Sequence, residues 1–428
     1  MKSPVLGFAG LTHLGVTSAI ASAARGFQVI GYHDDDQLCA ALNRGELHVQ
    51  EPQLKPLLVQ HLARLTFVSS LACFAECDIV YISLDIPSDE NGKSDLAPVR
   101  SMIDKATAKM RADAILVILC QVPPGFTRSL VWPETQLYYQ VETLVFGRAV
   151  DRAIHPERFI LGCVRPLEPV AQRLLCYLEA FGCPVLPMCY ESAELAKIAI
   201  NIFLVASVTA ANTLAELCEQ VGADWAEIVP SLRLDKRIGK HAYLNPGLGI
   251  AGGNLERDLA TVVSYAKYHG TDASVVSAWV AHSNYCKNWA LRKLNALVLL
   301  QTPDAKIALL GLTYKEDTHS TKNSAALELL GQIATRKVTA FDPYAADDAT
   351  GPEVIRAQTP IGAIEGADVL LIMTPWPQFK DISASQLADS MVGRVIIDPY
   401  RMLDRMELTA KGFTYVTLGA PVDSQGVN

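Results

Sequence analysis

The sequence lacks long apolar runs and lacks an excess of basic residues. No uninterrupted apolar run approaches the roughly 20 residues that cross a bilayer, and the start "MKSPVLGFAG" leads into a strand pattern without a signal-peptide pattern. Lys and Arg number 37 against 45 Asp and Glu, giving a formal net charge of -8, which disfavours nucleic acid or an anionic membrane as partner. We therefore expect a cytoplasmic protein with no nucleic-acid and no membrane partner.

Cysteine is present, but not in the spacing of a metal site. The chain has 10 cysteines, and the only close pair, Cys73 and Cys77, has no second pair to complete a ligand set. Several others stand singly among apolar neighbours: Cys39, Cys120, Cys163 and Cys218. We expect reduced cysteines in the core and no metal.

Apolar residues are abundant, half of the 428 residues, which suffices for roughly two or three domains. In the first half, short apolar runs alternate with helical patterns: "PVLGFAG", "FQVIGYH", "CDIVYISL", "AILVILC" and "CPVLPM". This rhythm is typical of βαβ units in a parallel, doubly wound sheet. From about Glu191 one long helix-compatible stretch follows, ended by Gly222.

After Gln301 the strand rhythm returns with "KIALLGL", "KVTAFDP", "ADVLLIMT" and "RVIIDPY", in the same order as in the first half. We predict an α/β fold of two Rossmann-like, doubly wound domains joined by a long central helix and a helical middle domain. The expected bounds are 1-188 for the N-terminal domain, 189-295 for the central domain and 296-428 for the C-terminal domain.

The stretch "GLTHLG", Gly10 to Gly15, follows an apolar strand and opens a helix, the context of a dinucleotide fingerprint. Thr12 stands at the second glycine, where the backbone approaches the pyrophosphate most closely, and His13 and Leu14 follow it. A plain turn between strand and helix, without a dinucleotide, remains an alternative.

The second strand ends in "HDDD", where an acid that holds the adenosine ribose is expected. His33 takes that position, and Asp34, Asp35 and Asp36 follow directly. Three carboxylates disfavour a 2'-phosphate, so the pattern favours NAD over NADP.

Lys197 and Asn201 lie four residues apart in the long helical stretch, so they share a face. An ammonium beside a carboxamide holds an oxyanion, a water or a sugar hydroxyl in a cleft of low dielectric. The alternative is a solvated helix surface.

Further loops stand at strand ends, where doubly wound folds bind ligands. These are "VPPGFT", "LDIPSDENGKSDL" and "GLTYKEDTHSTKNS", the last of which offers Lys315 and Lys322 to a phosphate. The stretch "GIAGGNLERD" predicts a tight loop into a helix. Its polar side chains, Asn254, Glu256, Arg257 and Asp258, include no good nucleophile.

Taken in order, these motifs resemble the nucleotide-sugar dehydrogenases of the UDP-glucose/GDP-mannose type. The resemblance runs from Gly7 to about Leu403 and includes "ALNRGELHVQEPQL", "VPPGFTRSL", "ESAELAKIAINIFL", "NTLAELCEQVGAD" and "ADVLLIMTPWPQF". It implies an NAD-dependent oxidation of the sugar C6 alcohol to a carboxylate in two hydride transfers. It also implies an N-terminal NAD domain, a homodimer built on the central helix, and a C-terminal domain that binds the nucleotide sugar.

The resemblance also assigns catalytic roles. The family loop GFGGSCFPKD carries a cysteine that captures the aldehyde as a thiohemiacetal and then a thioester, and Asn254 stands at that position. Asp258 matches the aspartate that helps to activate water, and Lys197 and Asn201 match the pair that stabilises the oxyanion.

One change concerns a second stretch, which has the pattern PEFLRE in the family. Glu142 matches its first acid, while Phe146 replaces the second.

Binding residues follow from the same comparison. Those expected at the cofactor are Gly10, Thr12, His13, Leu14, Gly15, His33, Asp34, Pro87, Gln121 and Lys322. Those expected at the substrate are Arg237, Tyr243, Asn245, Gly249 and Lys315. Gln121 stands where a threonine is usual. Lys322 replaces an arginine that approaches the NAD pyrophosphate, which keeps the charge but loses the bidentate fork. In "DPYRML", Tyr400 stands at an expected arginine and Arg401 comes one place later.

Three functions stay open. The first is an NAD-dependent oxidoreductase on a UDP- or GDP-sugar that forms no thioester, and either stops at an aldehyde or ketone or reaches the acid through an aldehyde hydrate. The second is a non-oxidising enzyme such as an epimerase. The third is a catalytically silent relative that binds a nucleotide sugar. The resemblance suggests polysaccharide or glycosylated-metabolite synthesis, and the residues select neither the base nor the sugar.

Overall fold

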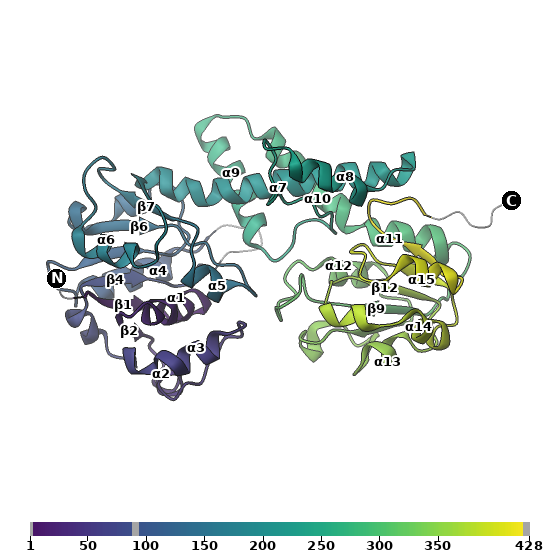
Figure 1. Cartoon of the computed structure of the whole chain (residues 1–428), viewed down its shortest axis with the longest axis horizontal. Coiled ribbons are helices and arrows are strands. Elements are labelled where there is room, and N and C mark those ends of the chain that lie inside the picture. Colours follow the sequence, from purple (N-terminus) through teal and green to yellow (C-terminus); the bar gives the residue numbers. More distant parts are fainter. Residues whose placement is uncertain (1–2, 88–93, 423–428) are drawn as a thin grey trace. The chain divides into compact units, whose positions relative to one another are not determined.

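The computed structural model describes residues 3–87 and 94–422, and the chain divides into two compact units, Met1–Ile200 and Asn201–Asn428. The loop "LDIPSDENGKSDL" is described only at its two ends, because residues 88–93 lie outside the described part. Figure 1 shows an α/β architecture with a sheet in each unit.

The first unit is built on an eight-stranded sheet with the order β3-β2-β1-β4-β5-β6-β7-β8. The strands are β1 (Val5–Ala9), β2 (Gln28–Tyr32), β3 (Leu65–Val68), β4 (Ile79–Ile82), β5 (Ile115–Ile118), β6 (Leu137–Gln140), β7 (Phe159–Cys163) and β8 (Val185–Cys189). The first six strands run parallel in the doubly wound order. β7 pairs with β6 in the antiparallel sense, which departs from the all-parallel expectation.

Helices cover both faces of this sheet, and each face has its own apolar cluster. They are α1 (His13–Ala24), α2 (Asp36–Asn43), α3 (Leu54–His61), α4 (Ala97–Thr107), α5 (Ala149–Ile154) and α6 (Gln172–Glu179). β4 and β5 are buried along their whole length, which explains their continuous apolar sequence. The chain leaves β1 towards β2 on one side and returns to β4 on the other, so the topological switch point lies between β1 and β4.

The long helix predicted after Glu191 is confirmed as α7, Tyr190–Val221, and it ends before Gly222, whose φ is +79°. By length and composition α7 is able to cross a membrane, since an 18-residue window of it has a mean hydropathy of 1.8. The sequence-based expectation considered only uninterrupted apolar runs, whereas α7 keeps a high mean hydropathy although Ser, Thr and Asn interrupt its apolar residues. A single helix of this kind is weak evidence for a membrane protein, because the core helices of other proteins pass the same test.

The second unit continues with α8 (Trp225–Leu234), α9 (Asn254–His269), α10 (Ser274–Lys287) and α11 (Trp289–Leu294). An all-parallel sheet follows in the order β11-β10-β9-β12-β13-β14. Its strands are β9 (Ile307–Leu310), β10 (Val338–Phe341), β11 (Val354–Arg356), β12 (Val369–Ile372), β13 (Val395–Ile397) and β14 (Thr414–Val416), and its helices are α12 (Ala325–Gln332), α13 (Pro360–Ile364), α14 (Ala384–Ser390) and α15 (Arg405–Ala410). The order repeats that of the first six strands of the other sheet, so the prediction of two doubly wound domains and a helical middle is confirmed.

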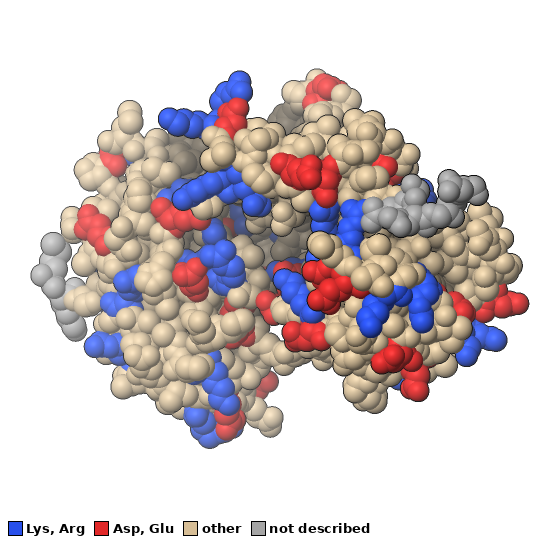
Figure 2. Space-filling model, turned by 45° about the vertical axis from the view of Figure 1, so that its right-hand side comes forward, with Lys and Arg blue, Asp and Glu red and all other residues tan. Residues whose placement is uncertain are grey.

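Charge and cysteine follow the composition. Figure 2 shows Lys and Arg interspersed with Asp and Glu on the face in view, without one large area of a single sign. All 10 cysteines are free, and most are buried, including Cys39, Cys120, Cys163 and Cys218. Cys176 is exposed, which corrects the expectation that all of them lie in the core.

Candidate functional site

The turn between β1 and α1 has the geometry of a dinucleotide loop. Gly10 has a φ of +103°, and a Cβ there would lie 2.5 Å from Leu84 Cδ2. A Cβ on Gly15 would lie 1.9 Å from the Gly10 carbonyl oxygen, so both positions require glycine. Thr12 is the N-cap of α1, and its hydroxyl donates to the Ser83 carbonyl at 3.3 Å. The first backbone N–H groups of α1 lack partners within the helix, and such a terminus binds anions.

A buried carboxylate ties this turn to the loop before α5. The Glu51 side chain is 1% exposed, and its Oε2 lies 2.9 Å from His13 Nε2. Its two oxygens also accept from the N–H groups of Gly147, at 3.1 Å, and Ala149, at 2.7 Å. The Phe146 ring packs on the His13 ring, with centroids 4.2 Å apart. Phe146, which stands where the resemblance implies an acid, therefore contributes an apolar wall beside the cofactor loop.

The carboxylates after β2 have separate tasks. Asp35 caps α2 by accepting from the N–H groups of Gln37 and Leu38 at 2.8 and 3.2 Å. Asp36 accepts from the Ser69 hydroxyl. The Asp34 side chain is 86% exposed and lies 3.3 Å from His33 Nδ1, so Asp34 is the carboxylate best suited to ribose hydroxyls.

These residues fit NAD. The N–H groups at Thr12, His13 and Leu14 would hold the pyrophosphate, and Asp34 would hold the ribose. Pro87 and Gln121 follow β4 and β5, at the carboxyl ends of adjacent parallel strands, where this fold binds ligands.

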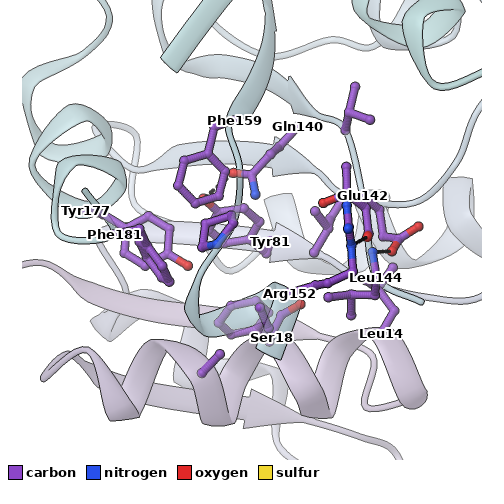
Figure 3. A pocket seen from close by; sticks show the side chains of 17 residues that line it. Leu14, Ser18, Tyr81, Gln140, Glu142, Leu144, Arg152, Phe159, Tyr177 and Phe181 are labelled. Atoms are coloured by element: carbon purple, nitrogen blue, oxygen red, sulfur yellow. Dashed lines mark hydrogen bonds between the residues drawn. The ribbon is translucent and has the colours of Figure 1, made fainter. Parts of the chain in front are cut away.

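The first unit also contains a cavity of about 50 Å³ inside its core, which is too small for a dinucleotide. Figure 3 shows the rings of Tyr81, Tyr177 and Phe181 gathered on one side of it and Glu142 with Leu144 on the other. Tyr81 donates to Gln140 Oε1 at 3.0 Å across the buried interior. The cofactor therefore belongs at the strand ends and not in this cavity.

Lys197 and Glu142 form an ion pair. Lys197 Nζ lies 3.2 Å from Glu142 Oε2, and the two side chains are 13% and 18% exposed. The other Glu142 oxygen accepts from the Leu144 N–H. The structure thus joins two residues that the sequence proposed separately, one on α7 and one after β6.

A third member of this region, Glu194, escaped sequence reasoning. It is fully buried on α7, one turn before Lys197, and accepts from the N–H groups of Gly125 at 2.6 Å and Thr127 at 2.8 Å. Burial raises the pKa of the Glu194 carboxyl, although the Thr127 and Gly125 N–H groups oppose the shift. Glu194 fastens the "VPPGFT" loop to α7. The signal that could have pointed to Glu194 is its place as an acidic residue within an apolar helical stretch.

In the second unit, Asn201 and Asp258 contact each other. Asn201 Nδ2 donates to Asp258 Oδ2 at 2.5 Å, and Arg257 Nε lies 3.7 Å from Asp258 Oδ1. Asp258 is 1% exposed. A buried carboxylate held by a carboxamide and a guanidinium is a fixed proton acceptor or water-orienting group.

The loop before α9 is tightly packed. A Cβ on Gly249 would lie 2.5 Å from the Ser283 carbonyl oxygen, and the Ser283 hydroxyl accepts from the Ile250 N–H at 2.8 Å. The Tyr314 ring covers Gly252, where a Cβ would lie 2.5 Å from Tyr314 Cε2. Asn254 is the first residue of α9, so the residue that the resemblance aligns with the family cysteine stands at a helix N-terminus.

Glu256 is a second residue that sequence reasoning left without a role. It accepts from the Asn323 side chain and pairs with Lys287 Nζ at 3.3 Å. Lys287 also lies 3.9 Å from Glu328. These contacts fasten the start of α9 to α10 and to the loop after β9.

The expected substrate residues are spread through the second unit. Arg237 forms a two-point ion pair with Asp235, at 3.0 and 2.6 Å, and is exposed. Tyr243 and Asn245 are exposed too. Lys315 is half-buried, with Nζ 6.0 Å from the centre of the Tyr314 ring. Of these residues, Gly249 belongs to the packed loop and lies against Ser283. Lys315 lies beside Tyr314, whose ring covers Gly252 of the same loop.

The turn after β13 uses its residues structurally. Asp398 is fully buried and accepts from Tyr400 N, Met402 N, Leu403 N and the Tyr415 hydroxyl. Arg401, at a φ of +54°, forms a two-point ion pair with Asp224, at 3.1 and 2.6 Å. Arg401 therefore secures the N-terminus of α8. Tyr400 donates to the Met373 carbonyl at 3.3 Å.

Two doubly wound units, the first opening on a dinucleotide loop, define an α/β protein of the Rossmann type. Three models of one family match the chain in order: the NAD binding domain over residues 5–173, the central domain over 191–285 and the UDP binding domain over 308–405. The chain belongs to the UDP-glucose/GDP-mannose dehydrogenase family, as the sequence motifs predicted. NAD is its cofactor, and when bound it would supply a hydride acceptor.

Relatives match over nearly the whole chain. The UDP-glucose 6-dehydrogenase of Rickettsia typhi is 27% identical over 436 residues, covering 97% of this chain and 99% of the relative. The enzyme of the same name from Pseudomonas aeruginosa is 29% identical over 439 residues, covering 96% of each.

Solved structures share the fold. The UDP-glucose dehydrogenase of Pyrobaculum islandicum gives a TM-score of 0.84 at 24% identity and 98% coverage of both chains. The UDP-D-ManNAc dehydrogenase of Pyrococcus horikoshii gives 0.83 at 23% identity, covering 97% of this chain and 99% of the other.

Proposed function

We propose that this protein is an NAD-dependent oxidoreductase that oxidises a C–OH group of a UDP- or GDP-sugar without forming a thioester. The observation that carries the proposal is that four catalytic residues implied by the family resemblance are present as two partly or fully buried pairs, Lys197 with Glu142 and Asn201 with Asp258. Relatives named UDP-glucose 6-dehydrogenase support the substrate class.

Each pair has a task in this chemistry. The Lys197 ammonium stabilises the alkoxide that develops as the substrate hydroxyl loses its proton, and Glu142 orients that ammonium. Asp258, held by Asn201 and Arg257, accepts a proton from the hydroxyl or from a water. Asn254 offers a carboxamide, which donates and accepts hydrogen bonds but forms no thioester.

Binding roles complete the proposal. We assign Gly10, Thr12, His13, Leu14, Gly15, His33, Asp34, Pro87 and Gln121 to the cofactor, and Arg237, Tyr243, Asn245, Gly249 and Lys315 to the nucleotide sugar. The domain bounds remain 1–188, 189–295 and 296–428. We place the protein in the cytoplasm, in line with its acidic composition.

The alternative is a silent or non-oxidising relative, such as a nucleotide-sugar binding protein or an epimerase. Asn254 in the nucleophile position favours it, together with Thr12 and His33 in the cofactor loop. Transient oxidation followed by reduction would also require NAD, so the alternatives differ from the proposal in the net NADH released.

Calorimetry with NAD and NADH, followed by counting NADH per sugar, tests the proposal. We expect NAD to bind in the micromolar range, because the glycines and the free terminus of α1 are intact. With UDP- and GDP-sugars we expect net NADH, one per sugar for an aldehyde or ketone and two for an acid. If the folded protein, checked by circular dichroism, binds no NAD at millimolar concentration, the result would favour a catalytically silent nucleotide-sugar binding protein. Binding without net NADH would favour the epimerase.

We also propose a homodimer built on α7. Apolar side chains on this helix are exposed in the single chain: Phe203, Leu214, Leu217 and Val221, and their spacing places them on one helix face. Phe203 alone is 75% exposed. An apolar stripe of this kind marks an interaction surface.

Light scattering checks the dimer. We expect the purified chain at twice its monomer mass and Phe203→Asp at the monomer mass, since a buried carboxylate in the interface would be unpaired. Val131→Asp is the matched control, because Val131 is also exposed but lies outside α7. A monomeric parent protein, or a dimer unaffected by Phe203→Asp, would contradict the proposal.

A further inference from the structure

The side chain of Lys322 lies across the loop that carries Asn254. The Gly252 N–H donates to the Lys322 carbonyl at 3.0 Å, which joins this loop to the segment after β9. From that anchor the Lys322 side chain runs along Gly253, the residue directly before Asn254. Its Cε, Cδ and Nζ lie 3.0, 3.2 and 3.2 Å from the place that a Cβ on Gly253 would occupy.

Glycine at position 253 makes this arrangement possible. Any side chain there would meet the Lys322 chain at a distance tighter than ordinary carbon contacts, and Gly253 has a φ of +93°, which other residues rarely adopt. Because Gly253 has no side chain, the Lys322 ammonium has room to lie beside the residue directly before Asn254.

This ammonium stands at an electrostatically unfavourable place. Gly253 is the N-cap of α9, a helix of 16 residues, and the positive end of a helix repels a cation. Lys287, another lysine near this loop, is paired with Glu256, whereas Lys322 forms no ion pair within the part of the chain that the structure describes. A negative charge on a bound substrate would relieve the repulsion.

We propose that Lys322 is a catalytic residue: with the Asn254 carboxamide, its ammonium stabilises the oxyanion of the C6 aldehyde hydrate during a second oxidation. This inference rests on the proposed function and deepens it, because it commits the protein to an acid product. Charge stabilisation by fixed donors replaces covalent capture of the aldehyde.

The step balances with the cofactor already assigned. The aldehyde adds one water to give a hydrate with two hydroxyls on C6. One hydroxyl loses its proton to Asp258, and the resulting oxyanion lies against Lys322 and Asn254. With a second NAD bound, C6 would lose a hydride to the nicotinamide, the C–O bond would become a carbonyl, and the product would be a carboxylic acid that ionises. One NADH and the released protons are the other products.

The sequence comparison suggested a different role for Lys322, contact with the NAD pyrophosphate. Kinetic measurements distinguish the two roles. A pyrophosphate contact acts in the binding of NAD and affects both hydride transfers, whereas an oxyanion contact affects the turnover of the hydrate at saturating NAD.

The test compares Lys322→Met, Lys322→Arg and the parent protein on two substrates, the nucleotide sugar and its C6 aldehyde, with NAD affinity measured by calorimetry. We expect Lys322→Met to lower kcat for aldehyde oxidation by about 100-fold. We expect it to change the single-turnover rate of the first hydride transfer from the alcohol, and the Kd of NAD, by less than about 3-fold. Lys322→Arg should restore most of the loss. Gly253→Ala keeps the charge but displaces the side chain, and it should reduce aldehyde oxidation in the same direction.

Three other outcomes would overturn the inference, and they differ in what they leave of the proposed function. A Lys322→Met protein with a Kd for NAD raised at least about 10-fold and an unchanged kcat on the aldehyde would overturn the inference in favour of the pyrophosphate contact. A parent protein that oxidises the alcohol and never the aldehyde would overturn the inference and leave the proposed function intact. A parent protein that oxidises neither would remove both.

Discussion

Replacing either Lys197 or Asp258 with alanine is expected to lower turnover by about 100-fold or more, with little change in the affinity for the nucleotide sugar. Lys197 is 13% exposed beside Glu142, and Asp258 is 1% exposed beside Asn201. Charges held in such surroundings act strongly on a developing oxyanion or on a proton in transfer, because little water screens them. Steady-state rates of NADH formation, with the Kd of the sugar from calorimetry, measure both quantities.

Matched controls come from an exposed helix of the first unit. Lys105→Ala and Asp104→Ala remove the same two charges from α4, where both side chains are exposed, and should leave turnover within about 2-fold. If Lys197→Ala or Asp258→Ala retains full turnover, that residue has no part in the chemistry. If affinity falls and kcat remains, the residue binds the substrate in its ground state.

The sequence predicted the elements with a strong periodic pattern. β4, β5 and β12 are continuous apolar runs because helices cover both faces of their sheets. α7 was recognised by its length and by the glycine that ends it. β6 and β7 were not predicted, because "LYYQ" and "FILGC" are short and lie among prolines and charged residues without a preceding helix of regular pattern. The antiparallel β6–β7 pair followed from tertiary pairing, which local pattern does not encode.

The candidate site shows the same division. Lys197 and Asn201 stood out because four-residue spacing on a helix is a local feature. Their carboxylate partners, Glu142 and Asp258, are more than 50 residues away in the chain, and only the family resemblance pointed to them. The resemblance covers Glu51, but it assigned no role to Glu51 or Glu256. Their hydrogen bonds to distant loops depend on how the strands and helices pack, so single-sequence reasoning had no means to assign them.

Introducing the nucleophile that the family resemblance implies, by Asn254→Cys, is expected to create a reactive thiol. The first residue of α9 lies at the positive end of a helix, and the Lys322 chain runs beside it. Both features stabilise a thiolate, which is the reactive form. We expect iodoacetamide to inactivate the variant about 100-fold faster than the parent protein. A nucleotide sugar bound beforehand should slow the inactivation.

Most of the native cysteines are buried and give the low background that this comparison requires, and the exposed Cys176 serves as the reference thiol. Burial raises the pKa of Cys73 and Cys286 to about 11, and that of Cys77 and Cys120 to about 12, so these thiols are protonated and enclosed at neutral pH. Asn254→Ser is the matched control, since it adds a hydroxyl of similar size that iodoacetamide does not alkylate under the same conditions. Mass spectrometry of the labelled peptide identifies the modified residue. If residue 254 of the Cys variant is alkylated no faster than the exposed Cys176, the start of α9 does not activate a nucleophile, and the missing thiol is not the sole change that separates this chain from thioester-forming enzymes.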